Sequence, residues 1–359
     1  MNIKGKNILI LGCGGGYDIF TGLPIYFNLR SNNNSNKESK RDIKLASFSF
    51  TKYDLLKQFP HEVENLYEVD ALNPYDNTYF PEYELSSRIN KSVYAISTDT
   101  DLVKYEEALI TIVKINNIDT VIAVDGGCDS VLFGVEEDLA TPVEDMMTVY
   151  LVNKFKKEGT IENAYLTCLG TNVELINHQD FIKNMEKIKE NNGLVDSINL
   201  KNIYEKSESE SESKSESKSE SNSQINKDDV NRYINLFKSC NTNNSIINSS
   251  IVASIEGHHG RYENPSLKNR ISLKENFPFL NEQTPILWIF DLEIVAKNII
   301  YLDQLDTLKD MDDIDAFTIY MNNVIHPPKI DKWDLNELYT KERMDRVKPL
   351  VHKLLNTKN

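Results

Sequence analysis

Short apolar runs alternate with longer amphipathic segments along most of the chain. The runs end in glycine or small polar residues, as is typical of strands buried on both faces of a parallel sheet. Apolar residues at helical spacing run from Asp101 to Ile115 and from Val143 to Phe155. This alternation predicts an α/β fold, with an open, mostly parallel Rossmann-like sheet and helices on both faces. The predicted strands are Asn7–Leu11, Ile43–Phe50, Ser92–Ser97, Thr120–Val124, Asn163–Leu169 and Pro285–Phe290.

Two polar segments interrupt this pattern. The segment Ser31–Arg41 is rich in asparagine, and Ser207–Ser223 has serine at nine of its seventeen positions. Neither segment can bury enough apolar surface to offset the entropy lost on ordering. We therefore predict disordered low-complexity insertions at residues 31–41 and 205–226.

The remaining chain is assigned to one domain and a tail. Residues 1–330 are expected to form a single Rossmann-like α/β domain, and residues 331–359 a C-terminal helical tail. An acidic run from Asp303 to Asp315 lies near the end of the domain, but it lacks the spacing and the glycine of an EF-hand calcium loop. We interpret this run as a solvated helical face.

Composition and charge narrow the classes of partner. The chain has 40 Lys and Arg residues against 55 Asp and Glu residues, a net charge of −15. Such a charge repels phosphate backbones and anionic lipids, so we expect neither a nucleic-acid nor a membrane partner. The four cysteines are unclustered, and no apolar run is long enough to cross a bilayer. We expect a cytoplasmic protein.

A glycine-rich turn follows the first predicted strand. Backbone amides at such a turn can approach an anion, which makes its glycines and its acid candidate ligand-binding residues: Gly12, Gly14, Gly15, Gly16 and Asp18. Tyr17 stands where a dinucleotide-binding fingerprint has its third glycine, and the second strand ends without a ribose-binding acid. An NAD(P) cofactor is therefore only weakly supported. A tight turn that needs glycine for packing alone is the other interpretation.

A second small-residue turn follows the strand Thr120–Val124. Asp125 and Asp129 flank Gly126 and Gly127, and two carboxylates at this spacing can converge on a water, a sugar hydroxyl or a divalent metal such as magnesium. We assign both aspartates as candidate catalytic residues and both glycines as ligand-binding. The alternative is a polar loop whose acids cap turns.

Two further segments could contribute to the same site. Gly170 follows the strand Asn163–Leu169, and the carboxyl ends of parallel strands lie at one edge of the sheet. The loop near residue 258 offers His258 as an acid or base and Arg261 as an anion clamp. Exposure in a surface loop, without function, is the other interpretation of the histidine.

Several of these segments resemble the archaeal and eukaryotic proteins grouped as domain of unknown function 1152. The resemblance covers most of the chain outside the serine-rich tract, and its most specific stretch is the one from Asp125 to Asp145. It implies a Rossmann-like α/β domain with a glycine-rich pocket, and it implies no reaction. This chain has Asn172 where the family tends to have Asp. The other segments that carry the resemblance are Gly12–Asp18, Glu256–Arg261 and Trp288–Ala296.

Together these features predict an enzyme that acts on a small anionic or nucleotide-like metabolite by hydrolysis or group transfer, in a crevice at the carboxyl ends of the strands. A non-catalytic small-molecule sensor or binding protein would use the same crevice. An NAD(P)-dependent oxidoreductase is the weaker alternative. The oligomeric state is left open.

Overall fold

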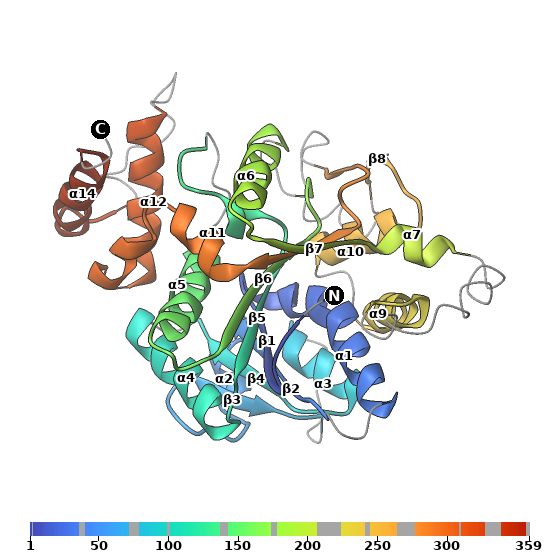
Figure 1. The fold of residues 1–359 in the computed structure, drawn as a ribbon. Coiled ribbons are helices and arrows are strands. Elements are labelled where there is room, and N and C mark those ends of the chain that lie inside the picture. The colour runs from blue at the N-terminus through green and yellow to red at the C-terminus, as the bar shows by residue number, and fades with distance from the viewer. Residues whose placement is uncertain are drawn as a thin grey trace.

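The fold is built on one eight-stranded sheet with helices on both faces (Figure 1). In order across the sheet, the strands are β3 (Leu66–Val69), β4 (Val93–Ser97), β2 (Asp42–Ser49), β1 (Asn7–Gly12), β5 (Thr120–Gly126), β6 (Asn163–Leu169), β10 (Ile286–Asp291) and β7 (Leu194–Asn199). The computed structural model describes residues 1, 3–35, 40–71, 79–98, 101–136, 143–173, 178–206, 224–240, 245–263, 277–308, 310–326 and 339–356.

The five central strands, from β4 to β6, are parallel, and the three outer strands are antiparallel to their neighbours. This confirms the predicted α/β class and the mostly parallel sheet. All six predicted strands are present, with ends that differ by at most two residues. The prediction missed β3 and β7, because both are short and polar residues interrupt them, so that neither forms a continuous apolar run like those of the central strands.

One face of the sheet is covered by helices from the middle and the end of the chain. Alternation along β1 turns Leu9 and Leu11 toward this face, where they join a large apolar core. The helices that cover it, at the left and the top of Figure 1, are α4 (Leu102–Ile115), α5 (Val143–Lys157), α6 (His178–Glu190), α11 (Leu292–Asn298), α12 (Met311–Ile325) and α14 (Lys341–Asn356).

The opposite face receives Ile8 and Ile10 of β1 and forms a second core. The elements that cover it are the 3-10 helix η1 (Gly16–Gly22), α1 (Leu23–Ser35), α3 (Pro81–Ile89), α7 (Leu200–Glu205), α9 (Lys227–Ser239) and α10 (Ile246–Ile255). The remaining elements are α2 (Tyr53–Leu56), the 3-10 helices η3 (Asp129–Val131) and η7 (Leu302–Thr307), and the strand pair β8 (Gly260–Arg261) and β9 (Phe279–Leu280).

The first predicted insertion is in part helical. Helix α1 continues to Ser35, so the first five residues of the segment 31–41 extend a helix. Ser31 explains the continuation, because its hydroxyl donates to the carbonyl of Phe27 at 2.9 Å and to Asp229 of α9 at 3.4 Å. Packing between α1 and α9 therefore overrides the low helix propensity of serine and asparagine.

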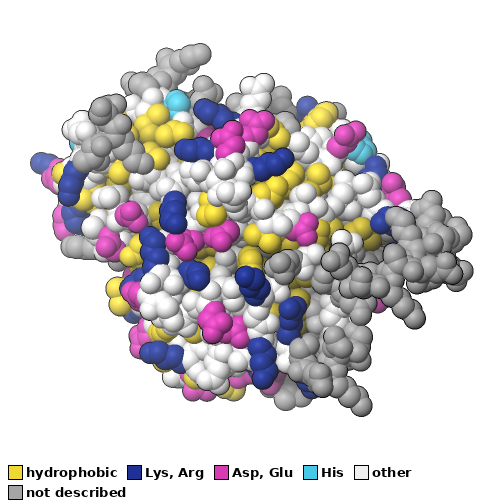
Figure 2. Space-filling view, viewed as in Figure 1, with side chains coloured by type: hydrophobic (Ala, Val, Ile, Leu, Met, Phe, Trp, Pro, Cys, Tyr) yellow, Lys and Arg dark blue, Asp and Glu magenta, His cyan; other side chains and the backbone are white. Residues whose placement is uncertain are grey.

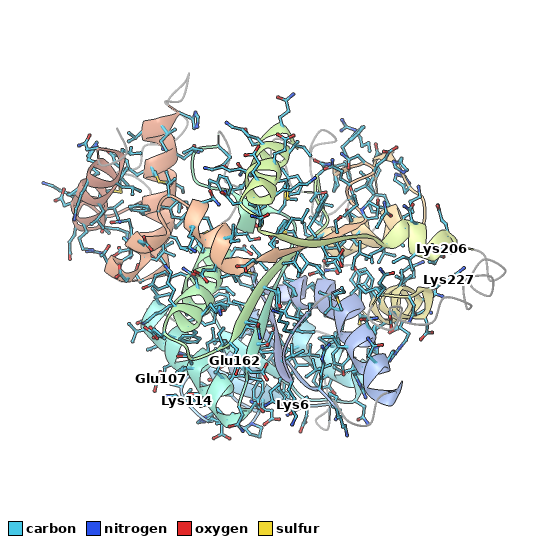
Figure 3. The ribbon with its side chains drawn as sticks, in the orientation of Figure 1. Lys6, Glu107, Lys114, Glu162, Lys206 and Lys227 are labelled. Atoms are coloured by element: carbon cyan, nitrogen blue, oxygen red, sulfur yellow. The ribbon has the colours of Figure 1, made fainter. Side chains whose placement is uncertain are left out.

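Most of the second predicted insertion, residues 207–223, lies outside the described residues. Its two flanks are adjacent: the ammonium group of Lys227 donates to the backbone carbonyl of Lys206 at 2.7 Å (Figure 3). The described residues on either side of the serine-rich tract thus lie together, between α7 and α9.

The sequence predicted that the acidic run near the C-terminus is a solvated face, and this prediction holds for only part of the run. Asp313 is 1% exposed and lies between two arginines of α14, Arg343 at 2.9 Å and Arg346 at 2.6 Å. Burial of this carboxylate is possible because both guanidinium groups compensate its charge. The run therefore joins α12 to α14, while exposed Asp312 conforms to the prediction.

Candidate functional site

The sheet reverses its strand order beside β1. The chain passes from β1 outward to β2 and β4 on one side, and then returns to β5 and β6 on the other. At such a point the loops that follow the two adjacent strands diverge, and open α/β sheets place their ligands in the resulting crevice. Here the crevice lies between the carboxyl ends of β1 at Gly12 and β5 at Gly126.

Three aspartates meet at this point. One carboxylate oxygen each from Asp18, Asp125 and Asp145 lies within 4.8 Å of the other two. Asp18 is carried by η1, Asp125 by the end of β5 and Asp145 by the first turn of α5. Asp125 and Asp145 are buried and Asp18 is partly exposed. We call these three residues the acid cluster.

Two glycines make room for the acid cluster. A β-carbon at Gly14 would lie 2.7 Å from carboxylate oxygens of both Asp18 and Asp145, and one at Gly126 would lie 2.7 Å from an Asp18 oxygen. The amide of Gly14 donates to Asp18 at 2.9 Å. The turns thus need glycine here because carboxylates approach the backbone closely.

Hydrogen bonds fix the deepest carboxylate. The amide of Ser130 donates to Asp125 Oδ2 at 3.2 Å, and the Ser130 hydroxyl donates to the same oxygen. Thr148 of α5 donates to the carbonyl of Cys13, directly after β1, at 3.1 Å. The elements that carry the cluster are therefore connected by side chains of η3 and α5.

Burial controls the electrostatics of the site. Desolvation, with the nearby charge of Asp125, raises the pKa of Asp18 well above its usual value. Desolvation also raises the pKa of Asp125 to about 6, although hydrogen bonds from Ser130 oppose the shift. Burial beside carboxylates raises the pKa of the Cys13 and Cys168 thiols, so both remain protonated and are poor nucleophiles near neutral pH.

The donor set fits a divalent cation. Oxygen ligands of Mg²⁺ lie at about 2.1 Å from the ion and hence about 3 to 4 Å from one another, a spacing compatible with the acid cluster. Neither Asp18 nor Asp125 forms an ion pair within the part of the chain that the structure describes. Crowded buried carboxylates without such pairing must bind protons or a cation. The acid cluster is therefore a candidate magnesium site.

The other glycines of the first turn are required by packing. Gly15 and Gly16 have positive φ angles of 89° and 57°. A β-carbon would lie 2.7 Å from the Phe50 ring at Gly15 and 2.3 Å from the Tyr79 hydroxyl at Gly16, and at Gly12 it would lie 3.0 Å from the amide of Ile19. These contacts match the packing interpretation of the turn.

Of the two aspartates predicted as a pair, only Asp125 belongs to the acid cluster. Asp129 is 2% exposed at the start of η3, but it is not among the three carboxylates that converge. Gly127 is buried and has a φ of 151°. The structure thus groups Asp125 with acids 107 residues before it and 20 residues after it, and not with the aspartate at the spacing that the sequence suggested.

The turn after β6 reaches the same crevice edge. Ile247 of α10 contacts the β-carbon positions of both Gly126 and Gly170, at 3.3 and 3.4 Å. The turns after β5 and β6 are therefore joined through α10. Residues 137–142 and 174–177, which continue the chain beyond these turns, lie outside the described residues.

His258 and Arg261 lie in a different part of the fold. They follow the C-terminal end of α10, whereas Ile247 at its other end contacts the crevice, and a helix of this length spans about 15 Å. Both side chains are exposed. His258 Nε2 lies 3.2 Å from the carbonyl of Arg261, and its ring packs against Tyr262. The structure does not bring this loop to the acid cluster.

Sequence reasoning missed Asp145 and Glu82. Asp145 ends the segment that carries the family resemblance, and an acid in the first turn of the helix after β5 was the signal that could have identified it. Glu82 of α3 is fully buried at the end of β2, where the hydroxyl of Thr51 donates to it at 3.1 Å. Burial raises the pKa of Glu82 to about 7. The sequence analysis found no acid at the end of the second strand. The structure places Glu82 there, and this residue comes from helix α3.

Among the comparisons with known proteins, one finds a match, and it lies in the middle of the chain. Residues 67–212 match a family model described as Protein of unknown function (DUF1152). This segment is similar to DUF1152. The DUF1152 segment includes Asp125 and Asp145, and Asp18 lies before it. No curated protein and no solved structure matches the chain.

Two surface features complete the description. None of the helices in the described ranges is long and apolar enough to cross a bilayer. Figure 2 shows one face of the molecule, on which Lys and Arg side chains are interspersed with Asp and Glu side chains. The excess negative charge is therefore not gathered into one uniform patch on this face.

The close approach of Gly126 to Asp18 gives a first test. We expect Gly126→Ala to lower the affinity for Mg²⁺ at least about tenfold, because the new methyl group displaces a ligand carboxylate, and such displacements cost 10- to 100-fold. Calorimetric titration with Mg²⁺ measures this. Gly159→Ala controls for a destabilising glycine substitution away from the acid cluster, since its φ of 73° strains any side chain while its β-carbon meets no atom within 4 Å. Equal affinities in the two variants would contradict the role of Gly126.

Proposed function

We propose that this chain is a divalent-cation-dependent enzyme that hydrolyses, or transfers a group from, a small anionic metabolite at the acid cluster. The observation that carries the proposal is the convergence of three carboxylates from η1, β5 and α5 at the point where the strand order reverses. An anionic substrate would be repelled by the cluster alone. Binding of such a substrate therefore requires a cation between the two.

The residues would divide the work as follows. Asp18, Asp125 and Asp145 hold the cation, which when bound polarises a phosphoryl or carboxyl oxygen of the substrate. Ser130 keeps the Asp125 carboxylate in place through its hydroxyl and its amide. Asp125 and Asp145 are buried, and the low dielectric constant around them would strengthen their interaction with the cation.

The direct test is a panel of nucleotides and sugar phosphates, assayed for phosphate release and binding with and without Mg²⁺. We expect Mg²⁺-dependent turnover of at least one compound, and at least about 100-fold less turnover in Asp145→Asn, since a cation ligand is lost. Asp129→Asn tests whether Asp125 acts with Asp129 or with the other residues of the acid cluster. It should retain far more activity than Asp145→Asn. Asp54→Asn, whose side chain is 96% exposed, controls for loss of one charge.

A sensor would behave differently from an enzyme. Cation-dependent binding without turnover of any compound would favour a non-catalytic binding protein. Because Lys206 and Lys227 are in contact, residues 207–223 can be replaced by a short glycine linker without separating α7 from α9. An enzyme should keep its rate after this replacement, whereas a sensor that signals through the tract should lose its response.

A further inference from the structure

A second cavity lies at the opposite edge of the sheet from the acid cluster. It has a volume of about 390 Å³, within the range of small-molecule sites. Its walls come from α1, α3 and α9. Helix α3 ends at Ile89, shortly before β4 begins at Val93. The C-terminal end of α3 therefore lies near the amino ends of the parallel strands. The residues that line the cavity are Phe27, Arg30, Arg88, Ile89, Arg232, Asn235, Leu236 and Ser239.

Three arginines from three helices share this cavity, in a chain whose net charge is −15. Arg88 is compensated, because it pairs with Glu84 at 3.2 Å and donates to the carbonyl of Ser239 at 2.7 Å. Within the described ranges, Arg30 and Arg232 form no ion pair with a carboxylate. Asp229 lies close enough to Arg232 for their charges to interact, but its Oδ2 accepts bonds from Asn226 and Asn28, and its Oδ1 accepts one from Ser31.

The guanidinium groups of Arg30 and Arg232 are held in place. Arg232 lies over the ring of Phe27 with 4.1 Å between its central carbon and the ring centroid. Arg30 donates to the hydroxyl of Tyr26 at 2.8 Å. Stacking and a single hydrogen bond orient the guanidinium planes and leave most of their N–H groups for another acceptor. A preorganised pair of this kind suits bidentate recognition of an oxyanion.

We propose that this cavity is a second ligand site, which binds the phosphoryl dianion of a small metabolite without a metal ion. Two guanidinium groups that form no ion pair among the described residues match the two negative charges of a phosphate monoester, and Phe27, Ile89 and Leu236 offer apolar surface to its organic part. The long-range negative field of the protein disfavours a polyanion such as nucleic acid. The site is distinct from the acid cluster and does not depend on its function.

Binding in EDTA separates the two sites. We expect adenosine 5′-monophosphate or glucose 6-phosphate to bind the full chain in EDTA by calorimetry, and to bind Arg30→Gln/Arg232→Gln at least about tenfold more weakly. The double Lys variant, which keeps the charge but loses the planar fork, should lie between them. Lys57→Gln is the matched control, since Lys57 also lies over an aromatic ring but outside the cavity. Asp145→Asn should leave this binding unchanged.

Several results would overturn the proposal. They are no binding of either probe at millimolar concentration, binding in EDTA that the double Gln variant retains, and binding that Asp145→Asn removes. Binding to phosphatidic acid vesicles without binding to the soluble probes would also overturn it, in favour of a lipid headgroup. The single variant Arg30→Gln, which loses the bond to the Tyr26 hydroxyl and the contact with the Tyr26 ring, decides the matter if the double variant does not fold.

Discussion

Replacing Asp125 with Asn will stabilise the cation-free protein and abolish both its response to Mg²⁺ and its turnover. Asp125 is 2% exposed, and its ionised form is destabilised by burial. Asn has nearly the same shape, can still accept a hydrogen bond from Ser130, and carries no charge. We expect a gain of about 1 to 3 kcal/mol in the free energy of unfolding at pH 7.5. Function is lost because a cation ligand has been removed.

The gain depends on pH with a definite sign. The pKa of Asp125 is raised from 3.8 to about 6 in the folded protein. Between these values the folded state binds more protons than the unfolded state, so the stability of the wild type falls as the pH rises. The advantage of Asp125→Asn is therefore complete above about pH 6 and shrinks as the pH falls toward 4. Urea denaturation in EDTA at several pH values measures it.

Addition of Mg²⁺ should make the wild type more stable than Asp125→Asn. The cation binds the folded wild type, raises its melting temperature and competes with the protons on the acid cluster. The Asn variant should show little or no shift, while Asp54→Asn, an exposed control, should respond like the wild type. An Asn variant that is less stable than the wild type in EDTA, or one with a full Mg²⁺ response, would contradict the cation site.

The central part of the fold was predictable because its strands are apolar throughout. In β1 and β5, every residue from Ile8 to Leu11 and from Val121 to Val124 is buried, so the sequence shows continuous apolar runs. Strand β7 carries Asp196 and Ser197 and pairs on one side only. Its sequence is compatible with a loop, and only pairing with β10 makes it a strand.

The candidate site was predictable in part. The turns after β1 and β5 were found because glycine and aspartate directly follow apolar strands. Asp145 was missed because it lies on a helix, where an acid in the first turn has an ordinary structural explanation. His258 and Arg261 have suitable chemistry, but their distance from the cluster depends on the course of α10, which no local pattern encodes. Long-range placement is what the sequence alone could not provide.

The contact between α12 and α14 gives the second large expected effect. Asp313→Ala should lower the free energy of unfolding by about 2 to 4 kcal/mol, because two guanidinium groups lose a buried partner. Asp312→Ala is the matched control. Asp312 also pairs with Arg343, at 3.1 Å, but its side chain is 71% exposed, so the cost should stay below about 1 kcal/mol. Urea denaturation compares the two variants.

Limited proteolysis shows which part of the fold is destabilised in Asp313→Ala. Arg343 and Arg346 are themselves trypsin sites, so release of α14 in Asp313→Ala should speed cleavage there relative to Asp312→Ala.

The Mg²⁺ response of Asp313→Ala should persist, because the acid cluster is carried by η1, β5 and the first turn of α5. Helix α12 reaches the loop after β5 through the bond from Asn322 to the carbonyl of Glu136. If Asp313→Ala also lost the Mg²⁺ response, that bond would transmit the docking of α14 to the site. Equal stability and equal cleavage of the two variants would instead show that burial adds nothing to this ion pair.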